Sequence, residues 1–296
     1  MAFSVILAPM PSEWIETNQI KLHVVTDGPI DGTPVILLHG FPEFHYGWRK
    51  QVPALTEAGF YVITPDQRGY NLSEKPKGIS SYKLESLAKD IIGLFDHYGI
   101  QKARLVGHDW GAVVAWYVGI RYPERLEKLA ILNVPHPDVM THFLLHDSEQ
   151  RKKSWYVYFF QLPFITEWEL SRQNYRNMAR MLVGSGLKST FSRRDIEEYK
   201  KAWSQPGALS AMINWYRSIV RESLKDLFRK RQPPRRIHVQ TLMMWGMKDV
   251  ALSHKMVQPS IDLCDDGKLI FFEHATHWVQ HDEANEVNKN LIEFLR

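Results

Sequence analysis

The chain has 296 residues, of which 44% are hydrophobic and 24% are charged, values typical of a globular protein. Its 37 basic and 33 acidic residues leave a net charge of +4, which is too small to indicate a nucleic-acid partner. The single cysteine, Cys264, excludes an internal disulfide, and no apolar run is long enough to span a membrane. We therefore expect a cytoplasmic protein with no nucleic-acid partner and no membrane partner.

Apolar runs alternate with helical segments along the first half of the chain. An early strand is expected over 20–26, where hydrophobic residues alternate weakly before a turn. The continuous apolar runs 34–38 and 60–64 are typical of strands buried on both faces of a parallel sheet. The further elements expected in this half are a helix over 43–58, a helix over 81–98, a strand over 103–106, a helix over 112–120 and a strand over 126–132.

The alternation stops at Asp138 and resumes only near residue 239. The interval is helical and rich in aromatic residues and methionine, and no buried strand is expected in it. Strands that alternate with helices imply a largely parallel sheet with right-handed crossovers. We expect an α/β core with a mostly parallel central sheet flanked by helices and an inserted helical cap, divided as follows: core, 1–137; cap, 138–231; core, 232–296. The last elements expected are a strand over 239–245, a helix from about Ser253, a strand over 268–272 and a helix over 283–295.

The segment 107–111 reads Gly-His-Asp-Trp-Gly between a short apolar strand and an apolar helix. This pattern is typical of a nucleophile elbow, in which the nucleophile occupies a sharp strand-to-helix turn. Here the residue at the nucleophile position is Asp109. A carboxylate is ionised at neutral pH and attacks without a base, and its attack on an sp3 carbon gives an ester that water can hydrolyse. The alternative interpretation is that Asp109 only caps the following helix.

Further polar residues follow other predicted strands. Ligands of open α/β sheets bind beyond the carboxyl ends of the strands, and Asp249 follows the strand over 239–245. Both His274 and His277 come after the last strand and compete for the role of base. The resulting chain order of nucleophile, acid and histidine is that of α/β-hydrolase triads. The His-x-x-His spacing has no third ligand to support a metal, so neither a metal nor another cofactor is expected.

From about Trp14 onward, the chain resembles an epoxide hydrolase of the α/β-hydrolase superfamily. The resemblance is carried by the segments 39–43, 66–70, 107–111, 277–280, 156–161 and 214–217. It implies that Asp109 attacks an epoxide carbon and that His277, oriented by Asp249, activates a water to hydrolyse the ester. It also implies that Tyr156 and Tyr216 donate to the opening epoxide oxygen, with Tyr158 as the competitor of Tyr156. A phenol is protonated at neutral pH and can supply both a hydrogen bond and a proton.

The same resemblance gives roles to four more residues. The backbone N–H groups of Phe41 and Trp110 are expected to form the oxyanion hole. Glu43 and His108 are expected to hold the hydrolytic water, although local structure explains them equally well, with Glu43 as a first-turn acid of its helix. The partner implied is a small-molecule epoxide, bound by a monomer or homodimer.

Four alternatives remain open. A haloalkane-type dehalogenase uses the same carboxylate chemistry, but such enzymes commonly carry Asn at the position of Phe41 and lack the tyrosine pair. A fluoroacetate dehalogenase is expected to carry Arg at the position of Trp110, and an esterase or C–C hydrolase to carry Ser at position 109. Finally, a member of the fold can bind a ligand without catalysis.

Overall fold

A computed structural model describes residues 11–226 and 233–296. The apolar segment 1–10 and the expected domain boundary at residue 231 lie outside these described ranges.

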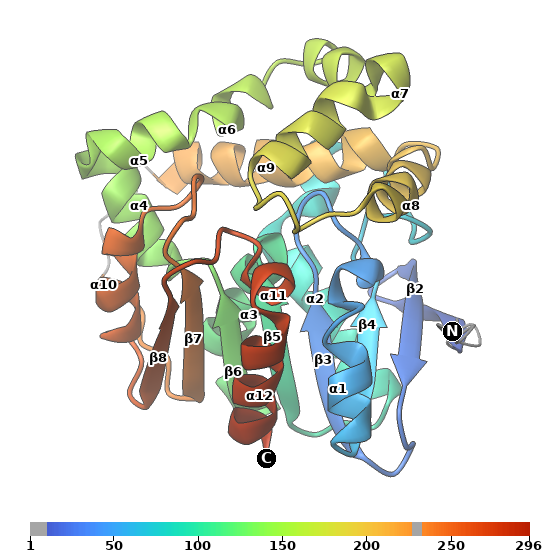
Figure 1. Cartoon of the computed structure of the whole chain (residues 1–296), viewed down its shortest axis with the longest axis vertical. Helices are drawn as coiled ribbons and strands as arrows, with labels where there is room; N and C mark the ends of the chain where they lie inside the picture. Colours follow the sequence, from blue (N-terminus) through green and yellow to red (C-terminus); the bar gives the residue numbers. More distant parts are fainter. Residues whose placement is uncertain (1–10, 227–232) are drawn as a thin grey trace.

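Eight strands form one sheet at the centre of the molecule (Figure 1). Their spatial order is β1-β2-β4-β3-β5-β6-β7-β8. The strands β1 and β2 pair antiparallel with their neighbours, and the other strands, β3 to β8, are all parallel to one another. The strands are β1 (Ser12–Thr17), β2 (Ile20–Asp27), β3 (Thr33–Leu38), β4 (Phe60–Pro65), β5 (Ala103–His108), β6 (Leu126–Leu132), β7 (Gln240–Gly246) and β8 (Gly267–Phe272). The predicted mostly parallel sheet is confirmed.

Helices cover both faces of this sheet (Figure 1). Successive residues of a strand point to opposite faces, so Val35 and Leu37 of β3 pack in one hydrophobic cluster and Ile36 and Leu38 pack in another. The first cluster includes α1 (Val52–Glu57) and α12 (Ala284–Leu295), and the second includes α2 (Leu84–His97) and α3 (Trp110–Arg121). The remaining short helices of the core are η1 (His45–Trp48), η2 (Ile79–Tyr82), η3 (Pro123–Arg125), η4 (His254–Met256), α10 (Val257–Ile261) and α11 (Val279–Asp282).

Among the described residues between β6 and β7, six helices stand above the ends of the parallel strands (Figure 1). We call them the helical insertion. They are α4 (Pro137–His146), α5 (Ser148–Lys153), α6 (Trp155–Phe159), α7 (Ile165–Gly184), α8 (Arg193–Trp203) and α9 (Ala208–Asp226). The chain leaves and re-enters the sheet at neighbouring strands, because Leu132 of β6 pairs with Met244 of β7.

Three expectations about the elements need correction. The strand β1 was not expected, and it forms a hairpin with β2 through Asn18 and Gln19, whose φ angles of 45° and 64° suit a primed turn. The helix expected over 43–58 is instead the short η1 followed by α1, which starts where Pro53 can occupy the first turn. The helix expected from about Ser253 is reduced to η4 and the five-residue α10.

Candidate active site

The elbow between β5 and α3 presents Asp109 at the carboxyl end of the parallel strands. Asp109 has φ 49° and ψ −123°, a conformation that is strained for a residue with a side chain. Asp109 occupies the N-cap position of α3, but its carboxylate makes no capping hydrogen bond, so capping by the side chain does not account for the carboxylate. The neighbouring chain passes so close that a Cβ at Gly40 would overlap the Asp109 side chain, and one at Gly111 would overlap the carbonyl of Leu38.

The two oxygens of the Asp109 carboxylate have different environments. Oδ1 accepts a hydrogen bond from the backbone N–H of Phe41 at 2.5 Å, and Oδ2 faces His277 Nε2 at 3.5 Å. Trp110 is the first residue of α3, where backbone N–H groups have no acceptor within their own helix. The backbone N–H of Phe41 therefore already donates to the Asp109 carboxylate. A second backbone N–H, that of Trp110, directly follows Asp109 in the sequence.

His277 lies between Asp109 and Asp249. Its Nδ1 is 2.7 Å from Asp249 Oδ2, and both side chains are almost fully buried. The other oxygen of Asp249 accepts hydrogen bonds from the backbone N–H groups of Ala251 and Leu252, each at 2.8 Å. The competing histidine, His274, is exposed. Of the two histidines, the structure brings His277 to the acid and the nucleophile.

Sequence reasoning missed Asn133, which follows β6. Its Nδ2 donates to Asp249 Oδ2 at 2.9 Å, and its Oδ1 accepts from the backbone N–H of Gly246 at 2.9 Å. Asn133 thus ties the ends of two neighbouring strands to the acid. Its position directly after a predicted strand was the feature of the sequence that could have identified Asn133 as a site residue.

The charges around His277 favour its protonated form. Burial alone would lower its pKa, but the negative charges of Asp249 and Asp109 outweigh burial and raise the pKa of His277 to about 10. For Asp249, burial alone would raise the pKa, but the interactions of its carboxylate with His277 and Asn133 outweigh burial and lower the pKa. Before any reaction, an imidazolium therefore lies between two carboxylates.

Two tyrosines of the helical insertion face each other near Asp109. The rings of Tyr156, on α6, and Tyr216, on α9, have centroids 6.0 Å apart at 85°, and the Tyr216 ring lies 4.9 Å from that of Trp110. Burial and the nearby charge of Asp109 raise the pKa of both phenols above the usual range, so both keep their protons. Tyr158, the competitor of Tyr156, is 63% exposed.

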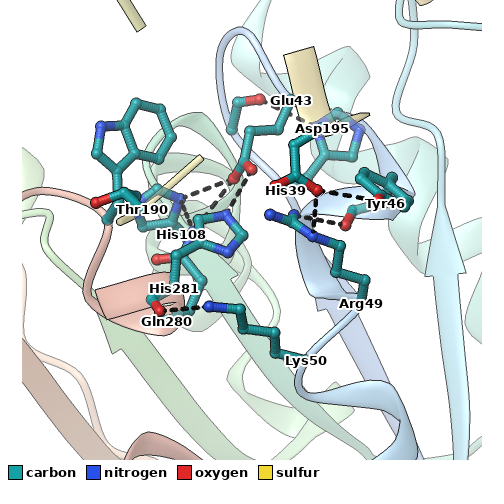
Figure 2. A network of polar contacts seen from close by, with 12 residues as sticks. His39, Glu43, Tyr46, Arg49, Lys50, His108, Thr190, Asp195, Gln280 and His281 are labelled. Atoms are coloured by element: carbon teal, nitrogen blue, oxygen red, sulfur yellow. Dashed lines mark hydrogen bonds and ion pairs between the residues drawn. The ribbon is translucent and has the colours of Figure 1, made fainter. Parts of the chain in front are cut away.

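Glu43 and His108 belong to a buried polar network (Figure 2). Glu43 lies before η1, so it is not a first-turn acid of a helix as one interpretation required. Its Oε1 accepts from His281 Nε2 at 2.7 Å and from the Tyr199 hydroxyl, and its Oε2 lies 3.7 Å from His108 Nδ1. His108 Nε2 donates to the backbone carbonyl of His277 at 2.8 Å because a carbonyl can only accept.

Contacts around this network join the core to α8 of the helical insertion (Figure 2). Arg49 pairs with Asp195 at 3.0 Å, and the Tyr46 hydroxyl donates to the same carboxylate at 3.0 Å. Trp203 Nε1 donates to the backbone carbonyl of Pro42 at 2.6 Å. Sequence reasoning gave no role to Tyr199, Arg49 or Asp195, because no local pattern links a core loop to a helix 150 positions away.

One group of side chains has the residue types of a metal site. Among residues 11–226 and 233–296, ligand atoms of His23, His45 and Asp66 lie within 4.8 Å of one another. The Asp66 oxygens already accept from His45 Nδ1 at 2.8 Å, His23 Nδ1 at 2.8 Å and Asn71 Nδ2 at 2.7 Å. These hydrogen bonds explain why the three side chains lie together: they stabilise a turn around Asp66.

In the same segment, the Arg68 guanidinium donates to both carboxylate oxygens of Asp90, at 2.7 Å to each.

Comparisons with known proteins identify the class. A family model described as "alpha/beta hydrolase fold" matches residues 33–284, so the chain is an α/β hydrolase. The crystal structure of a Bacillus megaterium epoxide hydrolase in complex with an inhibitor superimposes with a TM-score of 0.87 at 30% identity, over 96% of this chain and 99% of that one. No helix in the described part of the chain is long and apolar enough to cross a bilayer.

Sequence relatives narrow the class further. The chain is 44% identical to the AB hydrolase superfamily protein YfhM of Bacillus subtilis, over 96% of this chain and 97% of the relative. It is 31% identical to epoxide hydrolase A of Mycobacterium tuberculosis (95% and 96%) and 35% identical to human epoxide hydrolase 4 (95% and 77%). The chain belongs to the epoxide hydrolases of the α/β-hydrolase fold, which are hydrolases that act on ether bonds. This confirms the family resemblance noted in the sequence.

Proposed function

We propose that this protein converts an epoxide and water into a vicinal diol through an alkyl ester formed on Asp109. One observation carries the proposal: the Asp109 carboxylate has a backbone donor on one oxygen and His277 beside the other, with the protonated Tyr156 and Tyr216 nearby. A carboxylate nucleophile and two phenolic donors are the groups that ring opening of a strained ether requires.

In the first step, Asp109 attacks a ring carbon and the bond from that carbon to the epoxide oxygen breaks. Tyr156 and Tyr216 donate hydrogen bonds to the leaving oxygen, and one of them transfers its proton to the alkoxide. The ester that forms has no negative charge. The interaction with Asp109 that raises the pKa of His277 is thereby lost, and His277 can release its proton to solvent as the tyrosinate regains one.

In the second step, neutral His277 takes a proton from a water molecule that attacks the ester carbonyl carbon. The oxyanion develops where Asp109 Oδ1 already meets the N–H of Phe41, and the N–H of Trp110 is the second donor we assign. Collapse of this intermediate breaks the ester C–O bond, and the leaving alkoxide takes the remaining proton of the former water. The diol is then released, with Asp109 again a carboxylate and His277 an imidazolium. We assign Glu43 and His108 to hold the attacking water.

The helical insertion supplies both tyrosines, and we propose that it acts as a cap over the substrate. Division of the chain into a core of 1–137 and 232–296 and a cap of 138–231 follows from this role. The expected binding partner is a small apolar epoxide, because aromatic rings surround the two phenols: Phe41 and Phe160 lie 5.3 and 4.8 Å from the ring of Tyr216.

The test is to trap the ester. The variant His277→Gln loses the base for the second step but keeps the nucleophile, so incubation with a small epoxide should raise its intact mass by the whole epoxide. His274→Gln is the matched control, since His274 is exposed; this variant should turn over substrate without a stable adduct. An alkyl adduct formed from a haloalkane, with none from the epoxide, would identify a dehalogenase. No adduct from either compound, with turnover by the unaltered enzyme, would refute the covalent mechanism.

A further inference from the structure

A recess opens on the side of the core formed by η1, α1, α11 and α12. It has a volume of about 480 Å³ and its lining includes Arg49, Lys50, His281, Asp282, Asn285 and Asn288. None of its lining residues belongs to α6 or α9, the helices that carry the two tyrosines. His281, one of the lining residues, bonds to Glu43, so the recess meets the buried polar network at His281.

Buried polar atoms without a partner occur in residues that line this recess and in their neighbours in the chain. Of nine such side-chain atoms in the described ranges, five are Arg49 Nη2, Gln51 Oε1, Gln280 Oε1, His281 Nδ1 and Asn288 Oδ1. Buried polar groups are nearly always satisfied by protein or by ordered water, and a cluster of five unpaired atoms beside an open recess suits a file of water molecules.

Hydrogen bonds hold these residues together as one wall. Gln51 Nε2 donates to the carbonyl of Gln280, Lys50 Nζ donates to the carbonyl of His281, and Asn288 Nδ2 donates to the carbonyl of Lys50, each at 2.8 Å. Figure 2 shows Gln280 and His281 beside His108, with Lys50 on the opposite side of them from Glu43. Within this wall, His281 both lines the recess and bonds to Glu43 of the buried network.

His281 and Gln280 each present one bonded and one unpaired polar atom. His281 Nε2 donates to Glu43 Oε1, because a carboxylate only accepts, and burial lowers the pKa of His281, so the ring is neutral and its Nδ1 is an acceptor. Gln280 Nε2 lies 3.0 Å from His108 Nδ1 and 3.2 Å from Glu43 Oε2, and its Oε1 is the unpaired atom. Both side chains therefore bind the network on one side and offer an acceptor for water on the other.

We propose that the recess is the inlet of a water passage that runs past Gln51, His281 and Gln280 to Glu43 and His108 and supplies the water that hydrolyses the ester. This inference rests on the proposed function, in which one water is consumed in each turnover. In the ester, the alkyl group occupies the side of Asp109 that faces the two tyrosines. Water that arrives from the Glu43 side reaches the ester carbonyl without displacing that group.

Two variants on the wall test the passage without touching the residues of the proposed mechanism. Gln51→Leu and Asn288→Leu each replace a polar side chain that offers an unpaired oxygen by an apolar one of similar size. The control is Asn290→Leu, on the same helix α12, whose Nδ2 bonds only within that helix, to the carbonyl of Glu286. The rate constants for ester formation and ester hydrolysis are measured separately in single-turnover reactions quenched for intact mass.

Hydrolysis is expected to slow by about tenfold in both wall variants, the effect of about 1.4 kcal/mol for a lost water-mediated bond, while ester formation keeps its rate and ester accumulates during turnover. Equal slowing of both steps, or an unchanged hydrolysis rate, would overturn the passage. If the buried Gln51→Leu variant does not fold, Asn288→Leu, which is partly exposed, decides alone. A failed proposed function is recognised separately, because His277→Gln would then accumulate no ester.

Discussion

The phenolic hydroxyl of Tyr199, on α8 of the helical insertion, donates a hydrogen bond to the carboxylate of Glu43 in the core. Both side chains are buried, and a buried carboxylate costs free energy unless donors satisfy its oxygens. His281 and His108 further hold the pKa of Glu43 well below its usual range, against the effect of burial. The position of α8 and the charge of Glu43 are therefore coupled.

Replacing Tyr199 by Phe should measure this coupling. The change removes one donor to a charged acceptor and keeps the ring, so the free energy of unfolding should fall by about 1.5–3 kcal/mol. Urea unfolding of the variant and of the unaltered protein gives the difference. Tyr158→Phe is the matched control, because Tyr158 is 63% exposed and its variant should unfold like the unaltered protein. Equal stability of all three proteins would show that the bond contributes nothing.

The tyrosine pair predicts a graded loss of activity. In the proposed mechanism, Tyr156→Phe and Tyr216→Phe each remove one hydrogen bond to the developing alkoxide, which should lower kcat/KM for an epoxide about 10- to 100-fold. Removing both phenols also removes the proton donor, so the double variant should lose about 10²–10⁴-fold. Tyr158→Phe again serves as the control for the loss of a phenol. A single variant with unaltered kcat/KM would reassign that tyrosine to packing.

The charge of His277 predicts how stability depends on pH. Its folded-state pKa of about 10 lies above the ordinary value of 6.5, so the folded state binds a proton that the unfolded state releases between these values. The stabilisation is complete below pH 6.5 and is lost as pH rises through about 10. The difference in unfolding free energy between the unaltered protein and His277→Gln should therefore shrink by about 1.4 kcal/mol per pH unit in this window.

Urea unfolding of both proteins at several pH values between 6 and 10 checks this expectation, and titrations common to the two cancel in the difference. A difference that stays constant with pH would mean that His277 has the same proton affinity in the folded and unfolded states.

The sequence predicted the parts of the fold that depend on local pattern. The parallel strands appear as continuous apolar runs because both of their faces are buried, as residues 35–38 of β3 show. The elbow could be predicted because Gly107, Asp109 and Gly111 fall within five consecutive residues. The edge strand β1 was missed because its outer residues are exposed and its hairpin turn, Asn18-Gln19, lacks the usual glycine.

The sequence did not predict the contacts on which the candidate site depends. Glu43 was placed on a helix, whereas its burial is fixed by Tyr199 and His281, which are 156 and 238 positions away in the chain. Asn133 bonds across 116 positions to Asp249. No periodicity or motif encodes such pairs, because they arise only when the sheet order brings distant strand ends together.

The adjacency of β6 and β7 has a consequence for how this enzyme can diverge. All six helices of the insertion enter and leave at two neighbouring strands, so their lengths and sequences can change without altering the order of the sheet. The triad of Asp109, Asp249 and His277 lies on the sheet side of that junction. Selection for a different substrate can therefore act on one contiguous stretch of the gene while Asp109, Asp249 and His277 are inherited unchanged.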